Sequence, residues 1–384
     1  MSAAFPRGRA AIVGAATFGI GRAPGYDSLD LAAIAAVRAL DDAKVNLSEV
    51  DGLFFCHPFD GWGGGTLAQY LGIQPKVIDS SRLGGSAFQS FVEHAAYLLD
   101  AGSIDVALIT YGSNQASAAG KLPRTMLPMP YETPYKPLSP VSAYALVADR
   151  YRSVYGLKRE QLGEVALAAR RWAQLNPDAV KRDPLSMDDY LGARMVSDPL
   201  GVLDCCLVTD GGGAIVMTRA DRARDLNREP VHVLGAASMT THHHISAMPD
   251  LLTTGVADAG RRAFAAAGVG PSDMDVVQLY DAFTINVLLF LEDLGFCKKG
   301  EAASFVEGGA IAPGGRLAVN TNGGGLSCMH PGMYGLFTII EAVRQLRGEA
   351  GDRQVADTRL ALAQGNGGVL SNQGVVILGT SATL

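Results

Sequence analysis

The feature that most constrains the fold of this sequence is an internal repeat. The residues Ile-Val-Gly-Ala-Ala-Thr at positions 12–17 return as Val-Leu-Gly-Ala-Ala-Ser at positions 233–238. One match of this length arises easily by chance, but further matches follow in the same order along both parts of the chain. We therefore expect two similar halves, residues 1–225 and residues 226–384.

The later matches lie at the ends of apolar segments. Asp51 precedes one such segment and Asp275 precedes its counterpart, and Gly-Ala-Ile-Val at 213–216 is echoed by Gly-Val-Val-Ile at 374–377. Many of the 46 glycines stand at the ends of these segments, where a turn between a strand and a helix favours a residue without a Cβ atom. This arrangement is typical of α/β units.

Each half alternates strand-type and helix-type patterns. Short apolar runs bounded by glycine predict strands, and apolar residues at helical spacing predict helices at 29–43 and 87–99. The predicted strands are 10–13, 52–55, 106–110 and 214–217 in the first half and 231–234, 276–280, 360–363 and 375–378 in the second. The sequence therefore predicts an α/β fold.

The first half also contains an insertion, at about residues 114–203. It begins with a proline-rich loop, and long loops of this kind are usually lids or interfaces. The prolines are Pro123, Pro128, Pro130, Pro134, Pro137 and Pro140. A helical pattern follows from Arg159, and its apolar positions are expected to be core residues. These positions are Leu162, Val165, Ala166, Ala169 and Trp172.

Composition excludes several classes of protein. Lys and Arg total 32 against 38 Asp and Glu, a formal net charge of −6, and no basic stripe could follow a nucleic-acid backbone. The apolar runs at 287–291 and 375–378 are far shorter than the roughly 20 residues that span a bilayer, and we expect no cleaved secretion signal at residues 1–9. The five cysteines are scattered and lack a C-x-x-C pair, which favours a protein of the reduced cytoplasm.

Three conspicuous motifs are not interpreted as nucleotide, metal or catalytic-thiol sites. The Gly-Ala-Ala at 14–16 does not provide the Gly-x-Gly-x-x-Gly of a dinucleotide site. In the run of three histidines, only His242 and His244 would share a face of an extended segment, and two ligands make a poor metal site. Cys205 and Cys206 precede an apolar strand, where packing is their expected role. We expect no metal and no tightly bound cofactor.

Polar residues follow several of the predicted strands of the second half. Tyr280 ends one strand, and the glycine-rich segment 320–325 leads to His330, Tyr334 and a helix. Asn366 follows another strand in a glycine-rich turn. Because the carboxyl ends of strands in α/β sheets face the ligand crevice, these side chains are expected to converge on one site.

Taken together, these segments resemble the thiolase superfamily over nearly the whole chain. The resemblance rests on Asp-Cys-Cys at 204–206 with Asp-Gly-Gly-Gly at 210–213, on residues 155–177, on Tyr-Asp-Ala-Phe at 280–283, and on the glycines at 323–325 that run into His-Pro-Gly at 330–332. It implies duplicated α/β halves in a layered αβαβα arrangement, with a lid or loop insertion in the first half.

The sequence departs from that family where a thiolase needs its thiols. The acyl-accepting Cys of thiolases would stand near Ala87, but the chain has Leu-Gly-Gly-Ser-Ala-Phe at 83–88. The second Cys is also missing, since residues 363–368 read Ala-Gln-Gly-Asn-Gly-Gly, while His330 of the His-Pro motif is retained. Without a thiolate, acyl transfer through a covalent thioester lacks a carrier, because Ser86 has no evident activating base.

The pattern looks like the lipid-transfer-protein-type aldolases that shorten steroid side chains. This narrower resemblance rests on Tyr280 in place of the family's Asn and on Leu-Glu-Asp-Leu-Gly-Phe-Cys at 291–297. It implies a carbon–carbon lyase that cleaves a β-hydroxyacyl-CoA, with a steroid side-chain ester as the expected substrate, to a ketone and propionyl-CoA or acetyl-CoA. Coenzyme A would be part of the substrate.

A retro-aldol step needs a base for the β-hydroxyl, donors for the enolate oxygen and a proton for the α-carbon, and it needs no nucleophile. Tyr280 or Tyr334 would remove the hydroxyl proton, and the sequence does not decide between them. His330 would stabilise the enolate or handle the second proton. A phenol with a reference pKa near ~10 needs a neighbouring positive charge or hydrogen-bond donors to serve as base. The expected substrate-binding residues are Gly85, Ser86, Asp281, Asn366 and His244.

The resemblance also implies assembly. Thiolase-type subunits pair through the first half, which implies a homodimer, and the aldolase branch implies a small OB-fold and zinc-ribbon partner protein in a heterotetramer. Two alternatives remain open: a divergent thiolase or acyltransferase that acts on β-ketoacyl-CoA, and a non-catalytic lipid-carrier subunit. The retained His330 and the two tyrosines weigh against the second alternative.

Overall fold

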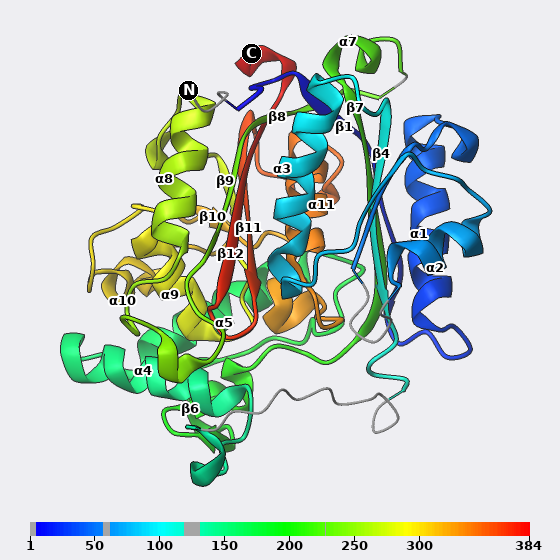
Figure 1. Ribbon diagram of the computed structural model, residues 1–384. Coiled ribbons are helices and arrows are strands. Elements are labelled where there is room, and N and C mark those ends of the chain that lie inside the picture. The colour runs from blue at the N-terminus through cyan, green and yellow to red at the C-terminus, as the bar shows by residue number, and fades with distance from the viewer. Residues whose placement is uncertain (1–4, 57–61, 119–130, 227) are drawn as a thin grey trace.

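A ten-stranded mixed sheet forms the centre of the protein (Figure 1). The computed structural model describes residues 5–56, 62–118, 131–226 and 228–384. The strands lie in the order β10-β9-β11-β12-β8-β1-β7-β4-β2-β3. Their bounds are β1 Ala10–Gly21, β2 Gly52–Phe55, β3 Val77–Asp79, β4 Val106–Ser113, β7 Asp210–Arg219, β8 Val231–Thr240, β9 Val276–Gln278, β10 Ala318–Val319, β11 Leu360–Gly367 and β12 Asn372–Gly379.

The strand order confirms the duplication. Counted outward from the central β1–β8 contact, β7 matches β12, β4 matches β11, β2 matches β9 and β3 matches β10. The two repeated aspartates make equivalent hydrogen bonds. Asp51 Oδ1 accepts the backbone N–H of Val106 at 2.9 Å, and Asp275 Oδ2 accepts that of Leu360 at 2.9 Å. Each carboxylate therefore ties the loop before one parallel strand to the first residue of its neighbour.

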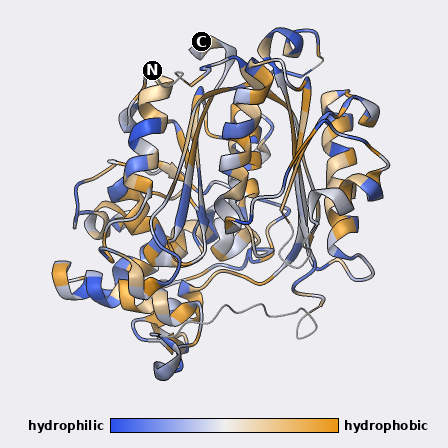
Figure 2. Cartoon of the chain, in the orientation of Figure 1, coloured by the Kyte–Doolittle hydropathy of each residue, from blue (hydrophilic) through white to orange (hydrophobic). Residues whose placement is uncertain are grey.

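Helices form three layers around the sheet (Figure 1). Helices α3 and α11 contact strands of both halves and lie between them, whereas α1 covers the first half and α8 the second on their outer faces. The helices of these layers are α1 Ser28–Ala43, α2 Gly64–Leu71, α3 Ala87–Asp100, α8 Val256–Ala267 and α11 Gly335–Leu346. The expected layered αβαβα arrangement is thereby confirmed. Hydrophobic and hydrophilic residues are both present along each of these helices (Figure 2).

The glycines of the repeated hexapeptide explain why it recurs. A Cβ atom on Gly14 would lie 2.1 Å from the carbonyl oxygen of Ala39 in α1, and one on Gly235 would lie 2.2 Å from that of Ala263 in α8. Only glycine lets the helix backbone approach the strand this closely. The same constraint therefore acts on β1 and on β8.

The insertion adds a helical region at one end of the sheet (Figure 1). It contains α4 Val141–Tyr155, α5 Arg159–Gln174, α6 Met187–Gly192 and a hairpin of β5 Met195–Ser197 and β6 Leu200–Gly201. The apolar positions predicted for α5 are buried, and Trp172 Nε1 donates to the carbonyl oxygen of Ile311 at 3.0 Å. Pro123, Pro128 and Pro130 lie outside the described residues.

The sequence did not predict every element. The edge strands β3 and β10 have only three and two residues, too few for an alternating pattern. Strand β9 ends at Gln278 rather than at 280, because side chains replace the ladder partners: Leu279 N donates to Asn320 Oδ1 and Tyr280 N to Gln364 Oε1. Further helical segments lie in the C-terminal half and in the β7–β8 connection: α7 Ala220–Ala223, α9 Thr284–Asp293, α10 Ala302–Phe305 and the π-turn η8 Gly324–Cys328. Within the described residues, no helix has both the length and the hydropathy that a membrane span requires.

Candidate active site

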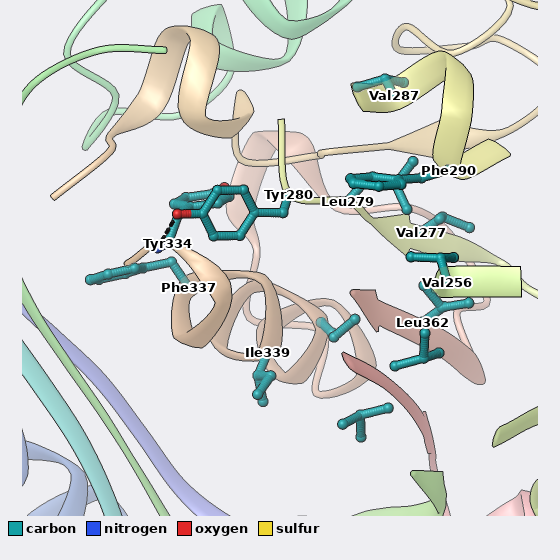
Figure 3. Packing of buried hydrophobic residues seen from close by; sticks show 14 of the residues in the cluster. Val256, Val277, Leu279, Tyr280, Val287, Phe290, Tyr334, Phe337, Ile339 and Leu362 are labelled. Carbon is teal, nitrogen blue, oxygen red and sulfur yellow. Dashed lines mark hydrogen bonds between the residues drawn. The ribbon is translucent and has the colours of Figure 1, made fainter. Parts of the chain in front are cut away.

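The Tyr280 hydroxyl lies at the centre of the candidate site. Its oxygen accepts the backbone N–H of Tyr334 at 3.1 Å (Figure 3), donates to the carbonyl oxygen of Gly332 at 3.1 Å, and lies 3.1 Å from His330 Nε2. The Tyr280 ring is nearly perpendicular to the rings of His330 and Tyr334, with interplanar angles of 84° and 82°. The three residues predicted to carry the chemistry are thus in direct contact.

The Tyr334 hydroxyl has a different environment. It donates to Asn322 Oδ1 at 3.0 Å, and the same oxygen accepts the backbone N–H of Gly324 at 2.7 Å. The Tyr334 ring stacks on Phe337, with ring centroids 6.0 Å apart. An acceptor at the hydroxyl stabilises the protonated phenol, whereas the N–H that reaches Tyr280 stabilises a phenolate. The two tyrosines are therefore chemically distinct.

His330 is held by its backbone, which leaves its ring free for chemistry. Its N–H donates to Thr209 Oγ1 at 3.1 Å, and its carbonyl oxygen accepts Gln115 Nε2 at 2.8 Å. Burial lowers the pKa of His330 to about 4, because the charged imidazolium loses its hydration. The ring is consequently neutral at pH 7 and can exchange a proton with the Tyr280 hydroxyl.

Burial also keeps both phenols protonated in the free protein. It raises the pKa of Tyr280 and of Tyr334 well above the usual value, and at Tyr280 the N–H of Tyr334 opposes this rise. The positive neighbour that a phenolate base would favour is absent at Tyr280 among the described residues, since His330 is neutral. A proton leaving substrate would have to pass through Tyr280 to His330 in a concerted step.

Asp281 faces the π-turn η8 rather than open space. Its Oδ1 accepts the N–H of Gly325 at 2.6 Å and its Oδ2 that of Leu326 at 3.3 Å. A Cβ atom on Gly324, whose φ is +64°, would lie 2.0 Å from Asp281 Oδ2, so this turn requires glycine. Burial raises the pKa of Asp281 to about 7. Whether this carboxyl also binds substrate remains a prediction.

Gly85 and Ser86 lie directly before α3, where the resemblance to thiolases would place an acyl-accepting Cys. A Cβ atom on Gly85 would be 2.1 Å from Cε2 of Tyr280, so the tyrosine ring fills the space that a side chain at this position would need. The Ser86 hydroxyl contacts two acceptors, the carbonyl oxygen of Leu83 at 2.8 Å and Asn372 Oδ1 at 2.5 Å. Neither acceptor is a base that could activate a nucleophile.

The Asp-Cys-Cys motif fastens the end of the insertion to the Tyr280 loop. Buried Asp204 accepts the hydroxyls of Tyr190 at 2.5 Å and Thr284, the first residue of α9, at 2.6 Å. Cys206 N donates to the carbonyl oxygen of Ala282 at 2.9 Å. Burial raises the pKa of Cys205 and of Cys206, so neither is a reactive thiolate.

His244 is separate from this network. The centroid of its ring lies 4.1 Å from that of His243. None of the hydrogen bonds described for Tyr280, His330 or Tyr334 involves His244. His242 lies 2.9 Å from the carbonyl oxygen of Val369 and is almost fully buried. Across the described part of the chain, no three His, Cys, Asp or Glu side chains are grouped to hold a metal ion.

Several polar residues near the site were missed. Asn322 lies in the glycine-rich segment that the sequence singled out, so its place could have been inferred. Gln364 and Asn286 lie within a strand and a helix, where nothing distinguishes them from ordinary polar residues. Tyr144 comes from α4 of the insertion and is brought to Asn366 only by tertiary packing. Asn366 itself is near the site, since a Cβ atom on Gly85 would lie 2.8 Å from its carbonyl oxygen and 2.1 Å from the Tyr280 ring.

Comparisons with known proteins show which family the chain resembles. A family model described as "Thiolase C-terminal domain-like" matches residues 237–380. The 17-hydroxy-3-oxo-4-pregnene-20-carboxyl-CoA lyase of Mycobacterium tuberculosis is 34% identical over 363 residues, 89% of this chain and 92% of that protein. A steroid side-chain-cleaving aldolase of Thermomonospora curvata is 32% identical over 379 residues, 94% of this chain and 96% of that protein.

A solved structure, described as an "Ltp2-ChsH2(DUF35) aldolase", superposes with a TM-score of 0.90. It is 32% identical in sequence, and the match covers 99% of this chain and 100% of that one. Both the fold and the sequence of the relatives are matched along nearly their full length. The chain belongs to the thiolase-fold family of steroid side-chain-cleaving aldolases.

Proposed function

We propose that this protein cleaves the bond between the α- and β-carbons of a β-hydroxyacyl-CoA, with a steroid side-chain ester as substrate. The products are a ketone and propionyl-CoA or acetyl-CoA. The proposal rests on one observation above all: the Tyr280 hydroxyl joins His330 Nε2 and the Tyr334 N–H beside Gly85, where a thiolase needs a nucleophile. Proton transfer is possible there and covalent acyl transfer is not.

The reaction needs one proton removed and one returned. The Tyr280 O–H first turns from the Gly332 carbonyl oxygen to His330 Nε2. Tyr280 then accepts the β-hydroxyl proton while its own proton moves to His330, the hydroxyl oxygen becomes the ketone oxygen, and the bond between the α- and β-carbons breaks. The electron pair of that bond forms the enolate of the thioester, and His330 then returns a proton to the α-carbon through Tyr280. The balance is complete without free coenzyme A or an oxidant.

The two tyrosines take different roles in this scheme. Tyr280 accepts a backbone N–H and touches the neutral imidazole, which supports its role as proton carrier. Tyr334 donates to Asn322, which supports a role as the hydrogen-bond donor that can turn to a developing enolate oxygen. A positioned acid or base of this kind contributes about 10²–10⁴-fold to a rate.

We further propose a homodimer with a small OB-fold and zinc-ribbon partner in the cytoplasm. The solved relative described as an Ltp2-ChsH2(DUF35) aldolase supports the presence of a partner. Exposed apolar side chains on and before α4 support an interface on the insertion: Tyr131 is 80% exposed, Tyr135 84% and Leu146 56%. At the β3 edge of the sheet, Ile78 is 45% exposed, which supports pairing between two copies through the first half.

The test is a product assay. The protein, co-produced with a small OB-fold partner, is incubated with a side-chain β-hydroxyacyl-CoA steroid without free coenzyme A, and mass spectrometry follows the ketone and the short acyl-CoA. Equal amounts of both products are expected. Cleavage of a β-ketoacyl-CoA only after addition of coenzyme A would instead identify an acyltransferase, and the absence of both reactions would identify a non-catalytic subunit.

A further inference from the structure

Tyr144 of the insertion helix α4 reaches the loop that carries Tyr280. Its side chain is 2% exposed, and its ring stacks on Phe283 with centroids 4.3 Å apart and an interplanar angle of 26°. Its hydroxyl accepts Asn366 Nδ2 at 3.0 Å and donates to the carbonyl oxygen of Gly368 at 3.3 Å. The insertion therefore places a polar group, as well as an apolar surface, inside the second half.

A chain of side-chain amides connects this hydroxyl to the backbone of Tyr280. Asn366 Oδ1 accepts Gln373 Nε2 at 2.7 Å, and Gln373 Oε1 accepts Gln364 Nε2 at 2.8 Å. Gln364 Oε1 then accepts the Tyr280 N–H at 2.9 Å. Each amide is both donor and acceptor, so the orientation of one fixes the orientation of the next.

A hydrogen bond from helix α9 holds the carbonyl group of Tyr280. Asn286 Nδ2 donates to the carbonyl oxygen of Tyr280 at 3.3 Å. Burial raises the pKa of Tyr144 to about 12, and the Asn366 and Asn286 amides oppose this rise. Asn286 Oδ1 is buried without a hydrogen-bond partner, which is unfavourable for an amide kept only for packing.

We propose that Tyr144 is a positioning residue, through which α4 fixes the Tyr280 backbone and hence the distance from the Tyr280 hydroxyl to His330. The Tyr280 N–H is held by a chain of amides that leads back to the Tyr144 hydroxyl, and the Tyr280 carbonyl oxygen accepts Asn286 Nδ2. Strand β9 has ended at Gln278, so no ladder hydrogen bond holds these groups instead. The inference rests on the proposed function for its effect on rate, but not for its effect on the position of Tyr280.

Helix α4 supplies a matched control. Tyr151, two turns along, is also fully buried and donates its hydroxyl to Glu292, a partner outside the amide chain. Tyr144→Phe and Tyr151→Phe each remove one buried hydroxyl from the same helix, so both are expected to lower thermal stability to a similar extent. Only Tyr144→Phe is expected to lower kcat, by about 10- to 100-fold with KM within about twofold, because a small misplacement of a reacting group has this effect.

Two further measurements separate positioning from packing. In an Asn366→Ala background, adding Tyr144→Phe is expected to change kcat by less than about twofold, because the connection is already broken. In protein labelled with 3-fluorotyrosine, the ¹⁹F resonance that disappears in Tyr280→Phe is expected to shift in Tyr144→Phe and to stay in place in Tyr151→Phe. If Tyr144→Phe does not fold, Gln373→Met breaks the amide chain elsewhere and carries the same expectation.

The outcomes separate this inference from the proposed function. If the wild-type protein cleaves no β-hydroxyacyl-CoA, the proposed function fails, and the ¹⁹F spectra still decide whether Tyr144 positions Tyr280. Equal effects of Tyr144→Phe and Tyr151→Phe on kcat, or an unshifted Tyr280 resonance in Tyr144→Phe, would overturn the inference.

Discussion

The backbone nitrogen of Tyr334 donates a hydrogen bond to the hydroxyl oxygen of Tyr280 at 3.1 Å. Tyr334 is the N-cap residue of α11, so this N–H belongs to the helix end that carries partial positive charge. That charge favours the phenolate of Tyr280 during proton transfer, although burial keeps the resting phenol protonated. We propose that this contact allows Tyr280 to act as a proton carrier at the position where thiolases have an asparagine.

Tyr280→Phe tests this role directly. The variant keeps the ring that packs against Gly85 but loses the oxygen that contacts His330 and the Tyr334 N–H. We expect kcat for cleavage to fall by about 10²–10⁴-fold. The loss of a buried hydroxyl should lower thermal stability, as in Tyr144→Phe and Tyr151→Phe, and circular dichroism would check that the variant is folded. Activity close to that of the wild type would remove Tyr280 from the mechanism.

Tyr334→Phe should give a different result, because its backbone N–H remains in place. The loss of the hydroxyl leaves Asn322 Oδ1 with only the Gly324 N–H. We expect a fall in kcat/KM of about 10²–10³-fold, as for other donors to a developing oxyanion. Steady-state kinetics over a range of pH would check it, and an unchanged kcat/KM would exclude the hydroxyl as a donor.

His330→Gln should alter how stability depends on pH. Burial lowers the pKa of His330 to about 4 from an ordinary value of 6.5, so the unfolded chain binds a proton more readily than the folded protein between these pH values. The wild type should lose stability as the pH falls from about 6.5 to about 4, by up to roughly 3 kcal/mol from this group. Urea unfolding at several pH values would show a weaker dependence in the variant.

Asp281 should affect the pH dependence of stability in the opposite direction, and Asp281→Asn tests this. Burial raises the pKa of Asp281 to about 7 from 3.8, so the folded protein holds the proton more tightly than the unfolded chain does. Ionisation of Asp281 should lower the stability of the wild type as the pH rises from about 4 to about 7, by up to roughly 4 kcal/mol. The variant lacks this contribution, so the stability difference between the two proteins should change with pH over that range; a constant difference would contradict the assignment.

The sequence predicted the fold well because the repeat is enforced by close packing. Gly14 and Gly235 must be glycine where α1 and α8 cross their strands, and Asp51 and Asp275 must be aspartate to hold the neighbouring strands. Such requirements keep the same residue type at equivalent positions of the two halves. The short edge strands β3 and β10 impose no such requirement and left no pattern.

The candidate site was predicted in part, and the difference has a physical cause. Tyr280, His330 and Tyr334 follow strand ends or precede a helix, which local sequence reveals. The roles proposed for the two tyrosines depend on the Tyr334 N–H and on Asn322. The positioning role proposed for Tyr144 depends on its hydrogen bond with Asn366, which lies 222 residues away along the chain. Hydrogen bonds of this kind exist only after the halves and the insertion have packed together.

Gly85→Ala tests whether catalysis needs the close fit between the Tyr280 ring and Gly85, which lies just before α3. The added Cβ atom would lie 2.1 Å from Cε2 of Tyr280 and 2.8 Å from the carbonyl oxygen of Asn366, so the ring must move. We expect stability to fall by about 1–3 kcal/mol, as in other overpacked sites, and kcat to fall about 10²-fold as the hydroxyl leaves His330. Gly192→Ala is the matched control, because a Cβ atom there meets nothing within 4 Å. A Gly85→Ala variant with both properties unchanged would show that the ring is free to shift without loss, and the close fit between Gly85 and Tyr280 would then have no part in catalysis.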